Sequence, residues 1–597
     1  MCGINLALNF PLRGQEAIRL MMESTRHRGP DQSSWKSINE QLFIAGNRLK
    51  TVDLGDWANQ PISIADQYFL VWNGALYNAE ELRNHLLQSG ATFESRSDSE
   101  VLLRWLMQKG EQGLGDLEGM FALVFVDSRR EQIIVARDSY GKKPLYYYHH
   151  GSQWLFSSEA GALVSSGLIE CSIDVEQYLP YFYSRHAFPG KSFYESVKQL
   201  EPGEMLKLDF EGKILSSYKR KEKVKKIGVA DKGQFKNLLT EAVLRHFQAD
   251  VPVGVLLSGG ADSSLLLHTW VEETGIPLHT FTLTFEDRYL RAYPDPKYAK
   301  KVAKKYNAAH HEVVITPDLV LENWGNYLGD LDQPIGDSAS FISWMIAKEA
   351  KKYVKILVSG AGADELFSGY SRHAAFRYFL KNKATMLKVA KMGKVLPLLG
   401  RKGRKMAHAV DASDDVTFLN FSSLQRIPKK HIAAFLKYYP EDLPPYKAAL
   451  TWDRQYYLVN DILKIHDNAL MCHGIEGRAP YLDKGLVDLS LSLDEEVHLQ
   501  LSNKEWIKGL LEDAGLKELA VRKKLGLGLP IKEWLKSHEG FREKVFKEIR
   551  EFEVKEGRNF PEEMLNLAKQ PSLYINDSFL QIWNLFVLAG WYRKKIK

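Results

Sequence analysis

Cysteine is scarce in this chain: Cys2, Cys171 and Cys472 are the only three among 597 residues, and they lie far apart. A disulfide framework needs a closely spaced, even set of cysteines, and many zinc sites carry CxxC pairs. This sequence shows neither pattern. Its cysteine usage is typical of a reducing compartment, and we expect a cytoplasmic protein.

Long apolar runs and a large excess of charge are also missing. No segment reaches the ~18 consecutive apolar residues of a membrane span, and no signal peptide is recognisable at the N-terminus. The formal net charge of +6 is small for 597 residues. Because an aromatic and basic binding motif is absent too, we expect neither a membrane span nor a nucleic-acid partner; the charge would suit an anionic small substrate.

The length predicts two or more domains, because one hydrophobic core rarely serves so many residues. Residues 2–215 contain short strand-like runs and a few helical patterns, which predicts a mixed α/β domain dominated by sheet. Residues 216–232 are rich in lysine, and we interpret them as a linker. Residues 233–597 begin with alternating strands, loops and helices, which predicts a parallel sheet followed by a mainly helical part. The basic segment 381–405 is interpreted as a solvated helix face, with a membrane surface or a partner as the alternative.

The second residue is a candidate nucleophile. If Met1 is removed, Cys2 carries both a thiol and a free α-amine, whose reference pKa of about 7.7–8.0 is close to cellular pH. Such an amine can accept the thiol proton directly or through one water, so one residue supplies nucleophile and base. Taken alone, a cysteine near the start of a chain more often has no such role, and the other motifs have to decide.

A glycine-rich loop between a buried strand and a helix predicts a nucleotide site. The apolar run Val253–Leu257 is followed by Ser258-Gly259-Gly260 and by a helix that begins near Asp262. Glycines let the backbone approach a ligand, and N–H groups at a helix N-terminus attract phosphate. No Gly-Lys-Ser/Thr follows, so the loop is not a Walker A motif. Because Asp262 would repel phosphates, a Mg²⁺ ion between them is implied.

A second loop repeats this pattern after the strand Lys355–Val358. Its sequence is Ser359-Gly360-Ala361-Gly362-Ala363-Asp364-Glu365, and Asp364 is a second candidate ligand for the same metal. Further on, Arg522-Lys523-Lys524-Leu525-Gly526 places cations beside a glycine. We interpret this stretch as a phosphate or pyrophosphate clamp, with a surface charge run as the alternative.

Together these motifs resemble the glutamine-hydrolysing asparagine synthetase family over nearly the whole chain. In the N-terminal part the resemblance rests on Met1-Cys2-Gly3-Ile4, Arg28-Gly29-Pro30-Asp31, Asn73-Gly74, Tyr77-Asn78, Ser97-Asp98-Ser99-Glu100 and the stretch Arg137–Tyr146. In the C-terminal part it rests on SGGADSS at 258–264, Asp364-Glu365-Leu366-Phe367, Gly369-Tyr370, Glu476, Arg478, Pro480, Leu482-Asp483, the segment 522–526 and the helix Leu580–Arg593. Order and spacing both agree, so a chance match is not credible.

The resemblance implies that residues 2–215 form a glutaminase domain of the N-terminal-nucleophile type, a four-layer αββα sandwich. Cys2 would attack the carboxamide of glutamine, and the Asn73 side chain with the Gly74 N–H would form the oxyanion hole. Arg48 would hold the α-carboxylate, and Asp98 would meet the α-ammonium. The released ammonia would travel internally to the second domain, a step that no motif reports.

For residues 233–597 the resemblance implies a PP-loop domain that binds ATP and Mg²⁺. An acceptor carboxylate would attack the α-phosphorus of ATP, and ammonia would displace AMP from the acyl-adenylate. Lys524 matches the family's catalytic lysine, while Asp262 and Asp364 would hold Mg²⁺. The residues expected to contact ATP or pyrophosphate are Leu256, Ser258, Gly259, Gly260, Asp262, Ser263, Ser264, Leu283, Ser359 and Gly360.

Two positions depart from the family. The family usually has Asn-Gly-Glu in the glutamine pocket, whereas this chain has Ala75. Loss of one charge-assisted hydrogen bond predicts weaker glutamine binding, by ~1.5–3 kcal/mol. After Ser359-Gly360 the family usually has Asp or Glu, whereas this chain has Ala361, which bears on the identity of the acceptor.

The leading hypothesis is an asparagine synthetase that converts aspartate, glutamine and ATP into asparagine, glutamate, AMP and pyrophosphate. The alternative is an amidotransferase of the same chemistry that acts on another carboxylate, such as a uronic-acid sugar or a secondary metabolite. A relative of the β-lactam synthetases is less favoured because Cys2 is retained. A catalytically silent scaffold is disfavoured because the whole set of candidate residues is present. The sequence leaves the oligomeric state open, with a homodimer as one option.

Overall fold

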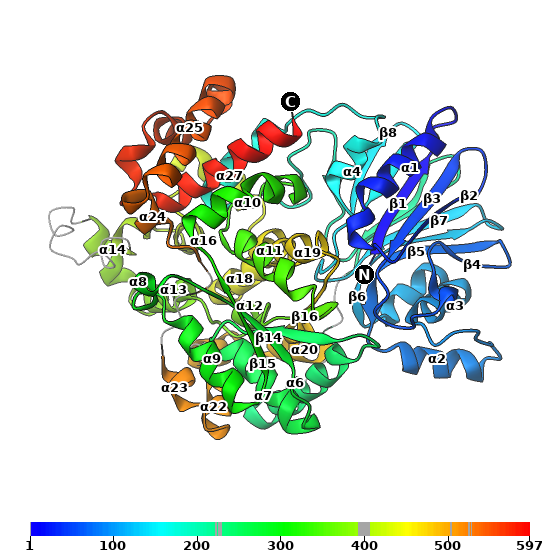
Figure 1. The fold of residues 1–597 in the computed structure, drawn as a ribbon, viewed down its shortest axis with the longest axis horizontal. Coiled ribbons are helices and arrows are strands. Elements are labelled where there is room, and N and C mark those ends of the chain that lie inside the picture. Colours follow the sequence, from blue (N-terminus) through cyan, green and yellow to red (C-terminus); the bar gives the residue numbers. More distant parts are fainter. Residues whose placement is uncertain are drawn as a thin grey trace.

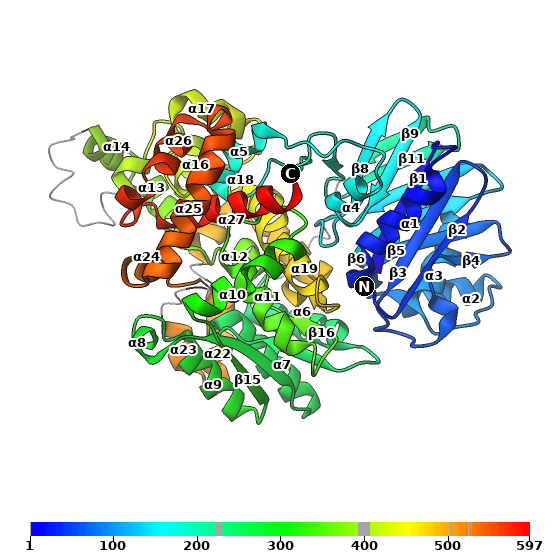
Figure 2. The same cartoon turned by 45° about the horizontal axis from the view of Figure 1, so that its top comes forward.

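The computed structural model describes residues 2–220, 224, 230–391, 406–501, 504–522, 526 and 528–596. Lys524, much of the predicted linker and residues 392–405 of the basic segment lie outside these described residues. Figure 1 shows two antiparallel sheets on one side of the molecule and a parallel sheet with most of the helices on the other. The turned view in Figure 2 shows the same division.

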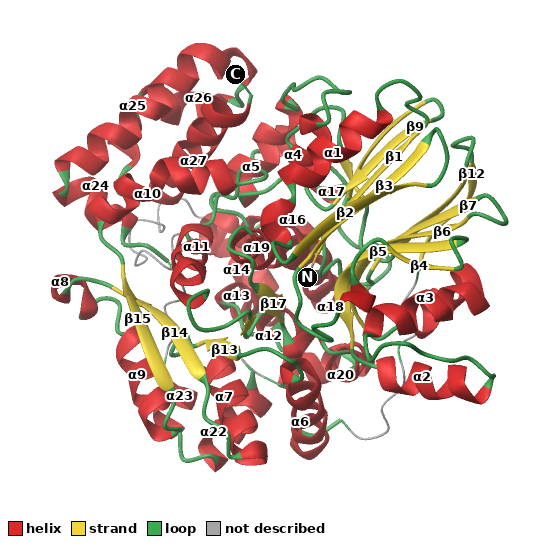
Figure 3. Ribbon diagram, turned by 45° about the vertical axis from the view of Figure 1, so that its right-hand side comes forward, coloured by secondary structure: helices red, strands yellow, loops and turns green. Residues whose placement is uncertain are grey.

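Two six-stranded antiparallel sheets lie face to face in the N-terminal part (Figure 3). The first sheet contains, in spatial order, β10 (Lys198–Gln199), β8 (Tyr146–His150), β9 (Gln153–Ser157), β1 (Cys2–Leu8), β3 (Leu42–Arg48) and β2 (Gln32–Ser37). The second contains β12 (Ile214–Lys219), β11 (Glu204–Asp209), β7 (Gln132–Arg137), β6 (Gly119–Asp127), β5 (Tyr68–Leu76) and β4 (Ile62–Ile64).

Helices cover the outer faces of both sheets. The first sheet packs against α1 (Gly14–Ser24) and α4 (Ala160–Ser165), and the second packs against α3 (Asp98–Lys109) beside α2 (Ala79–Gln88). Alternating residues of the strands, such as Ile4, Leu6 and Leu8 of β1, fill the buried layer between the sheets. The predicted αββα sandwich is thereby confirmed. β12 runs past the predicted domain boundary at residue 215.

The C-terminal part is built on a parallel five-stranded sheet, as predicted. Its spatial order is β15 (Ala309–Val314), β14 (His279–Thr284), β13 (Val253–Leu256), β16 (Ile356–Val358) and β17 (Glu476–Arg478). The central strand β13 has the next strand in sequence on one side and a later strand on the other. This reversal is the topological switch point at which open parallel sheets bind ligands.

The two faces of this sheet are buried by different helices. One face packs in a core with α6 (Lys232–Phe247), α7 (Ala261–Thr274), α9 (Asp295–Lys305), α20 (Lys484–Ser492) and α22 (Glu505–Asp513). The other face packs in a core with α10 (Pro317–Asp330), α11 (Ala339–Ala350), α19 (Leu463–Met471) and α27 (Phe579–Lys595). Ile356 and Leu357 of β16 fall in different cores, as the alternation of a strand requires.

The remaining chain is mainly helical, again as predicted. It includes α8 (Asp287–Leu290), α12 (Ala363–Leu366), α13 (Ser371–Lys381), α14 (Lys383–Lys391), α16 (Asp414–Ser422), α17 (Lys429–Leu436), α18 (Pro445–Trp452), the π-helical stretch η6 (Asp453–Ile462), α21 (Glu495–Gln500), α23 (Lys517–Val521), α24 (Ile531–Ser537), α25 (Glu539–Glu556) and α26 (Glu562–Lys569). Among the described residues, no helix is long and apolar enough to cross a membrane.

One segment of the N-terminal part packs with the C-terminal helices. The short helix α5 (Tyr178–Ser184) contacts α27, and the Tyr181 hydroxyl donates a hydrogen bond to the carbonyl of Asn584 at 3.0 Å. Figure 2 shows this cyan helix beside the red and orange ones. The two parts of the chain are therefore joined by a shared core.

Candidate functional site

Cys2 is the first residue of β1 and lies opposite Arg48 in the ladder with β3. Only 5% of its surface is exposed. Its sulfur accepts a hydrogen bond from Nε2 of Gln60 at 3.1 Å, and its backbone N–H donates to Oδ1 of Asn73 at 3.1 Å. Burial raises the pKa of the Cys2 thiol, and the nearby Arg48 opposes this rise. The thiol therefore needs a hydrogen-bond donor and a base to act as a nucleophile at neutral pH.

Asn73 belongs to β5 of the opposite sheet, so the site forms where the two layers meet. Its Oδ1 accepts the backbone N–H of Cys2, whereas its Nδ2 is buried and has no hydrogen-bond partner among the described residues. An unpaired buried amide donor is unfavourable unless a ligand completes it. Next to it, Gly74 lies so close to β6 that an added Cβ would be 2.1 Å from the carbonyl oxygen of Met120.

The guanidinium of Arg48 is held by backbone rather than by acids. It donates to the carbonyl of Gly55 at 2.6 Å, to Oδ1 of Asn59 at 3.0 Å and to the carbonyl of Asp53. No ion pair between described residues includes Arg48. A buried cation in this state can receive a ligand carboxylate.

Asp98 is the first residue of α3, and its Oδ2 accepts a hydrogen bond from the backbone N–H of Leu76 at 3.1 Å. This bond ties the carboxylate to the strand that carries Asn73 and Gly74. Burial raises its pKa, and the bond from Leu76 opposes that rise. The five residues predicted for the glutamine pocket are thus brought together from four different segments of the chain.

The second site lies at the carboxyl end of β13. The hydroxyl of Ser263, in the first turn of α7, accepts a hydrogen bond from the backbone N–H of Ser258 at 3.1 Å. Gly259 has a φ of +67°, and a Cβ there would lie 2.2 Å from the carbonyl oxygen of Asp295, so only glycine fits. The loop is therefore fixed with its backbone turned to the start of the helix.

The loops after β13 and β16 touch one another. The Cβ direction of Gly360 points to within 2.8 Å of Cβ of Asp262, and Ser359 directly follows β16. Arg522 donates to the carbonyl of Gly259 at 2.7 Å and pairs with Asp295, so this part of the predicted phosphate clamp does reach the loop. Leu283, at 5% exposure, and Ser258 line a small pocket with Gly526 and Gly528. Leu256 and Ser264 lie at the end of β13 and in the first turn of α7.

Asp262 and Asp364 converge on one point, and an unpredicted lysine lies there. Nζ of Lys504 is 2.7 Å from Oδ1 of Asp262 and 2.6 Å from Oδ1 of Asp364. The two carboxylates raise the pKa of the Lys504 ammonium against the opposing effect of its burial. Lys504 is itself a non-glycine residue with a φ of +61° immediately before α22. The two acids thus face one position, which the ammonium of Lys504 takes in this structure; the Mg²⁺ site expected there stays a prediction.

Buried ion pairs link the two parts of the chain beside the first site. Arg28, 1% exposed, donates to both carboxylate oxygens of Asp467 at 3.1 and 2.8 Å and to Oε1 of Glu159 at 2.9 Å. Its Nε also lies 3.4 Å from the carbonyl oxygen of Cys2. These residues line a pocket between the domains together with Lys142, Asp332, Gln333, Val459, Leu463 and Lys464.

Sequence reasoning missed Gln60 and Lys504. Gln60 stands in an ordinary Asn-Gln-Pro loop, and its contact with Cys2 spans 58 residues. Lys504 follows no glycine-rich loop, and 242 residues separate it from Asp262. Neither residue lies in a recognisable sequence motif, because each is placed by its contact with a residue far away in the sequence.

Two family models together match nearly the whole chain. Residues 1–219 match the glutamine amidotransferase domain, and residues 234–593 match asparagine synthase. The combination defines a class of two-site proteins that join a glutamine amidotransferase domain to a synthase domain. This chain belongs to the asparagine synthase family.

Curated relatives agree with this assignment. Asparagine synthetase [glutamine-hydrolyzing] 1 of Bacillus subtilis is 28% identical over 100% of this chain and 97% of its own length. Asparagine synthetase [glutamine-hydrolyzing] 3 of the same organism is 30% identical over 62% of this chain and 63% of its own length. Asparagine synthetase B of Escherichia coli is 29% identical over 61% of this chain and 62% of its own length. Among solved structures, a glutamine phosphoribosylpyrophosphate amidotransferase from B. subtilis is 17% identical, with a TM-score of 0.29 over 52% of this chain and 81% of its own.

Proposed function

We propose that this chain is a glutamine-dependent amide synthetase that uses ATP and, in the first instance, aspartate. The observation that carries the proposal is the buried Nδ2 of Asn73, which no described residue pairs, on the side chain whose Oδ1 accepts the backbone N–H of Cys2. A donor fixed in this way is suited to the oxyanion of a tetrahedral intermediate. The names of the full-length relatives support the overall reaction.

In the glutaminase half-reaction, Cys2 attacks the carboxamide carbon of glutamine after removal of Met1. The freed α-amine of Cys2 takes the thiol proton, and the oxyanion receives hydrogen bonds from Asn73 and from the N–H of Gly74. Arg48 binds the α-carboxylate of glutamine, and Asp98 binds its α-ammonium. The α-amine passes that proton to the departing nitrogen, ammonia leaves, and water then hydrolyses the thioester to release glutamate.

In the synthetase half-reaction, the backbone of the loops 258–260 and 359–360 holds ATP at the switch point of the parallel sheet. Leu256, Leu283, Ser263 and Ser264 complete this binding surface. The acceptor carboxylate attacks the α-phosphorus, pyrophosphate leaves, and ammonia then displaces AMP from the acyl-adenylate. Lys504 stabilises the negative charge that develops in adenylation, and we retain Lys524 as a second cation for the same purpose.

The donor set fits Mg²⁺, because two carboxylate oxygens point at one cation position and Mg²⁺ prefers such oxygen ligands. Asp262 and Asp364 would hold the ion, which when bound neutralises charge on the pyrophosphate group. The ammonium of Lys504 occupies that position here. Mg²⁺ bound there would replace the ammonium between the two carboxylates.

We infer an internal route for ammonia along the domain interface. Arg28, whose Nε is 3.4 Å from the carbonyl oxygen of Cys2, lines a pocket whose walls come from both parts of the chain. Its walls include Val459 and Leu463 of η6 and α19. Tyr457 of η6 is in ring contact with Tyr370, whose hydroxyl donates to Glu365 at 2.5 Å, next to Asp364. We therefore place the route along η6.

The test is pyrophosphate release with Mg-ATP and glutamine, with and without aspartate. Aspartate-dependent release that is lost in Cys2→Ala, and restored there by ammonium chloride, is the expected result. Glutaminase activity without aspartate-dependent release would instead indicate another carboxylate acceptor, for which Ala361 is the motivating residue. No glutaminase activity at all in the processed chain would overturn the proposal. We place the activity in the cytoplasm on the grounds of cysteine usage.

A further inference from the structure

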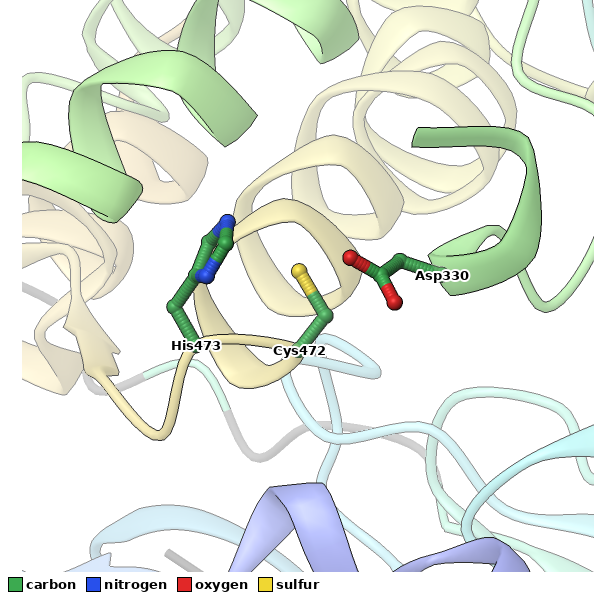
Figure 4. Close-up of side chains that lie close together, drawn as sticks. All are labelled: Asp330, Cys472 and His473. Carbon is green, nitrogen blue, oxygen red and sulfur yellow. The ribbon is translucent and has the colours of Figure 1, made fainter. Parts of the chain in front are cut away.

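A cluster of three metal-ligating side chains lies outside both proposed reaction sites. Asp330 is the last residue of α10, and Cys472 and His473 directly follow α19 (Figure 4). One ligand atom from each residue can be chosen so that all three lie within 4.8 Å of one another. Within the described ranges of the chain, no other three His, Cys, Asp or Glu side chains meet this condition.

The side chains of the cluster have few competing partners. Nε2 of His473 is buried and has no hydrogen-bond partner in the part of the chain that the structure describes. The Cys472 sulfur is half-buried and donates only a long bond, 3.3 Å, to the carbonyl of Ala469. Oδ2 of Asp330 accepts a bond from Nε1 of Trp344 at 2.8 Å, which orients the carboxylate. Figure 4 shows one oxygen of Asp330 turned toward the sulfur.

We propose that Asp330, Cys472 and His473 bind one Zn²⁺ ion. Sulfur, imidazole nitrogen and carboxylate oxygen are the three ligand types of zinc, and the thiolate disfavours Mg²⁺ and Ca²⁺. Bond lengths of about 2.0–2.3 Å put the ligand atoms of a tetrahedral zinc about 3.3–3.6 Å apart. The ligand atoms, which lie within 4.8 Å of one another, have to approach by about 1 Å to reach that spacing.

Zinc binding at this cluster requires no oxidant or reductant. The S–H bond of Cys472 breaks, its proton passes to solvent, and a zinc–sulfur bond forms. The thiolate and the carboxylate together offset the charge of the ion. Asp330 is exposed, so the site is open on that side and water can take the fourth position.

Zinc at this position would join the C-terminal ends of α10 and α19. Nδ2 of Asn468 in α19 is 3.4 Å from the carbonyl oxygen of Asp330 in α10, which is the existing link between them. The neighbouring Asp467 is the acid that pairs with Arg28. A metal that fixes the end of α19 to α10 is therefore expected to stabilise that pair, and the protein should melt at a higher temperature with zinc.

The experiment measures zinc binding by the full chain in a Cys2→Ala background, which removes the reactive thiol. Competition with a chromophoric chelator gives stoichiometry and affinity, and Co²⁺ in place of zinc reports sulfur ligation through its charge-transfer absorption. We expect one equivalent bound. Cys472→Ser and Asp330→Asn should weaken binding by more than the roughly 10–100-fold seen for residues that only orient a ligand. Cys171→Ser is the matched control and should bind as its parent does.

Two results would overturn the site. One is the absence of stoichiometric zinc binding at micromolar free zinc in the Cys2→Ala protein. The other is binding that persists unchanged in Cys472→Ser and Asp330→Asn. Asp330 lies on the surface, so its variant keeps the test valid if Cys472→Ser or His473→Gln folds poorly. The readout is metal content and not activity, so it is independent of the proposed function.

Discussion

Single residues of the glutamine pocket depend on partners from distant segments. Gln60 donates to the Cys2 sulfur at 3.1 Å, and its own Oε1 accepts the backbone N–H of Trp72 at 2.7 Å, which fixes the direction of the amide. Asn73 presents its oxygen to Cys2 and keeps Nδ2 for a ligand. The two amides thus contact Cys2 from two sides, one at its sulfur and one at its backbone nitrogen, which suits the roles we propose for them.

Asn73→Ala should lower kcat for glutamine hydrolysis by roughly 10²–10³-fold, because it removes a donor to the oxyanion. The KM for glutamine should change much less, since the donor acts in the transition state. Both constants follow from a glutamate-release assay. Synthesis with ammonium chloride serves as the control and should be retained; a variant that hydrolyses glutamine normally would contradict the role.

Gln60→Leu should move the acidic limb of the pH–kcat/KM profile of glutamine hydrolysis to higher pH. The substitution removes the donor that stabilises the Cys2 thiolate, and burial already raises the pKa of that thiol. It also leaves the N–H of Trp72 unpaired, which costs about 1–3 kcal/mol of stability. An unchanged pH profile together with lower stability would reduce Gln60 to a structural residue.

Ala75→Glu should tighten glutamine binding. Residues 73 and 75 point to the same side of β5, so a glutamate at 75 would enter the pocket beside Asp98. One added charge-assisted hydrogen bond of about 1.5–3 kcal/mol corresponds to a KM roughly 10- to 150-fold lower. Ala75→Gln is the neutral control; no gain with the charged residue would mean that Asp98 suffices.

At the scale of elements, the second site combines four chain segments at one strand end. The loops after β13 and β16 bring Asp262 and Asp364, the turn before α22 brings Lys504, and the segment after α23 brings Arg522. Because β13 and β16 end at the site and α7, α12 and α22 begin there, the carboxyl edge of the parallel sheet positions the whole set.

Lys504→Gln should lower the rate of adenylation by roughly 10²–10³-fold and leave glutamine hydrolysis intact. The change removes the cation between two carboxylates, which then repel one another. Lys508, one turn further along α22, is the matched control: it is half-buried but forms no ion pair with a described residue. Aspartate-dependent pyrophosphate release separates the variants. An equal loss of pyrophosphate release in the Lys504 and Lys508 variants would assign the effect to a change in α22 and not to the Lys504 ammonium.

The sequence predicted the αββα sandwich and the parallel sheet with its helical continuation, because these depend on local patterns. The strand–loop–helix pattern after Val253 predicts β13 and α7, and the glycine and aspartate residues of the two loops predict a nucleotide site there, which stays a prediction. The sequence could not predict that α5 packs on α27. Nor could it predict that Gln60 contacts Cys2 or that Lys504 contacts Asp262. Those contacts depend on packing between segments far apart in the sequence, which leaves no periodic signal.

At the scale of the whole molecule, a buried network of charges joins the two domains. His27 and Arg28 meet Glu159 of the same domain, and Arg28 also pairs with Asp467 of the other. Removing one partner of a buried ion pair typically lowers the free energy of unfolding by about 3–5 kcal/mol, because the remaining charge is left uncompensated. The strength of this network should therefore depend on pH.

The stabilisation from this network should be greatest at mildly acidic pH. Its ion partners lower the pKa of Glu159 to about 2, so its contribution is present above the ordinary value of about 4.5 and is lost as the pH falls toward 2. Glu159 raises the pKa of His27 against the effect of burial, so that contribution is complete below about 6.5 and is lost as the pH rises through the raised value.

His27→Gln should accordingly lower the melting temperature more at pH 6 than at pH 9. Scanning calorimetry of the wild-type and variant chains at both pH values measures the two differences, and His149→Gln, a surface change, controls for charge in general. A difference that does not depend on pH would show that His27 acts through packing alone.

The position of β1 within its sheet bears on when Met1 can be removed. This strand lies between β9 and β3, and all seven of its residues are buried, beginning with Cys2. A processing enzyme that must grip the first residues of an extended chain cannot reach them once the ladder has formed. If Cys2 is the nucleophile that we propose, methionine removal has to precede the pairing of β1 with β3 and β9. Protein refolded from denaturant with Met1 still attached should then resist the processing enzyme, whereas the unfolded chain should be cleaved.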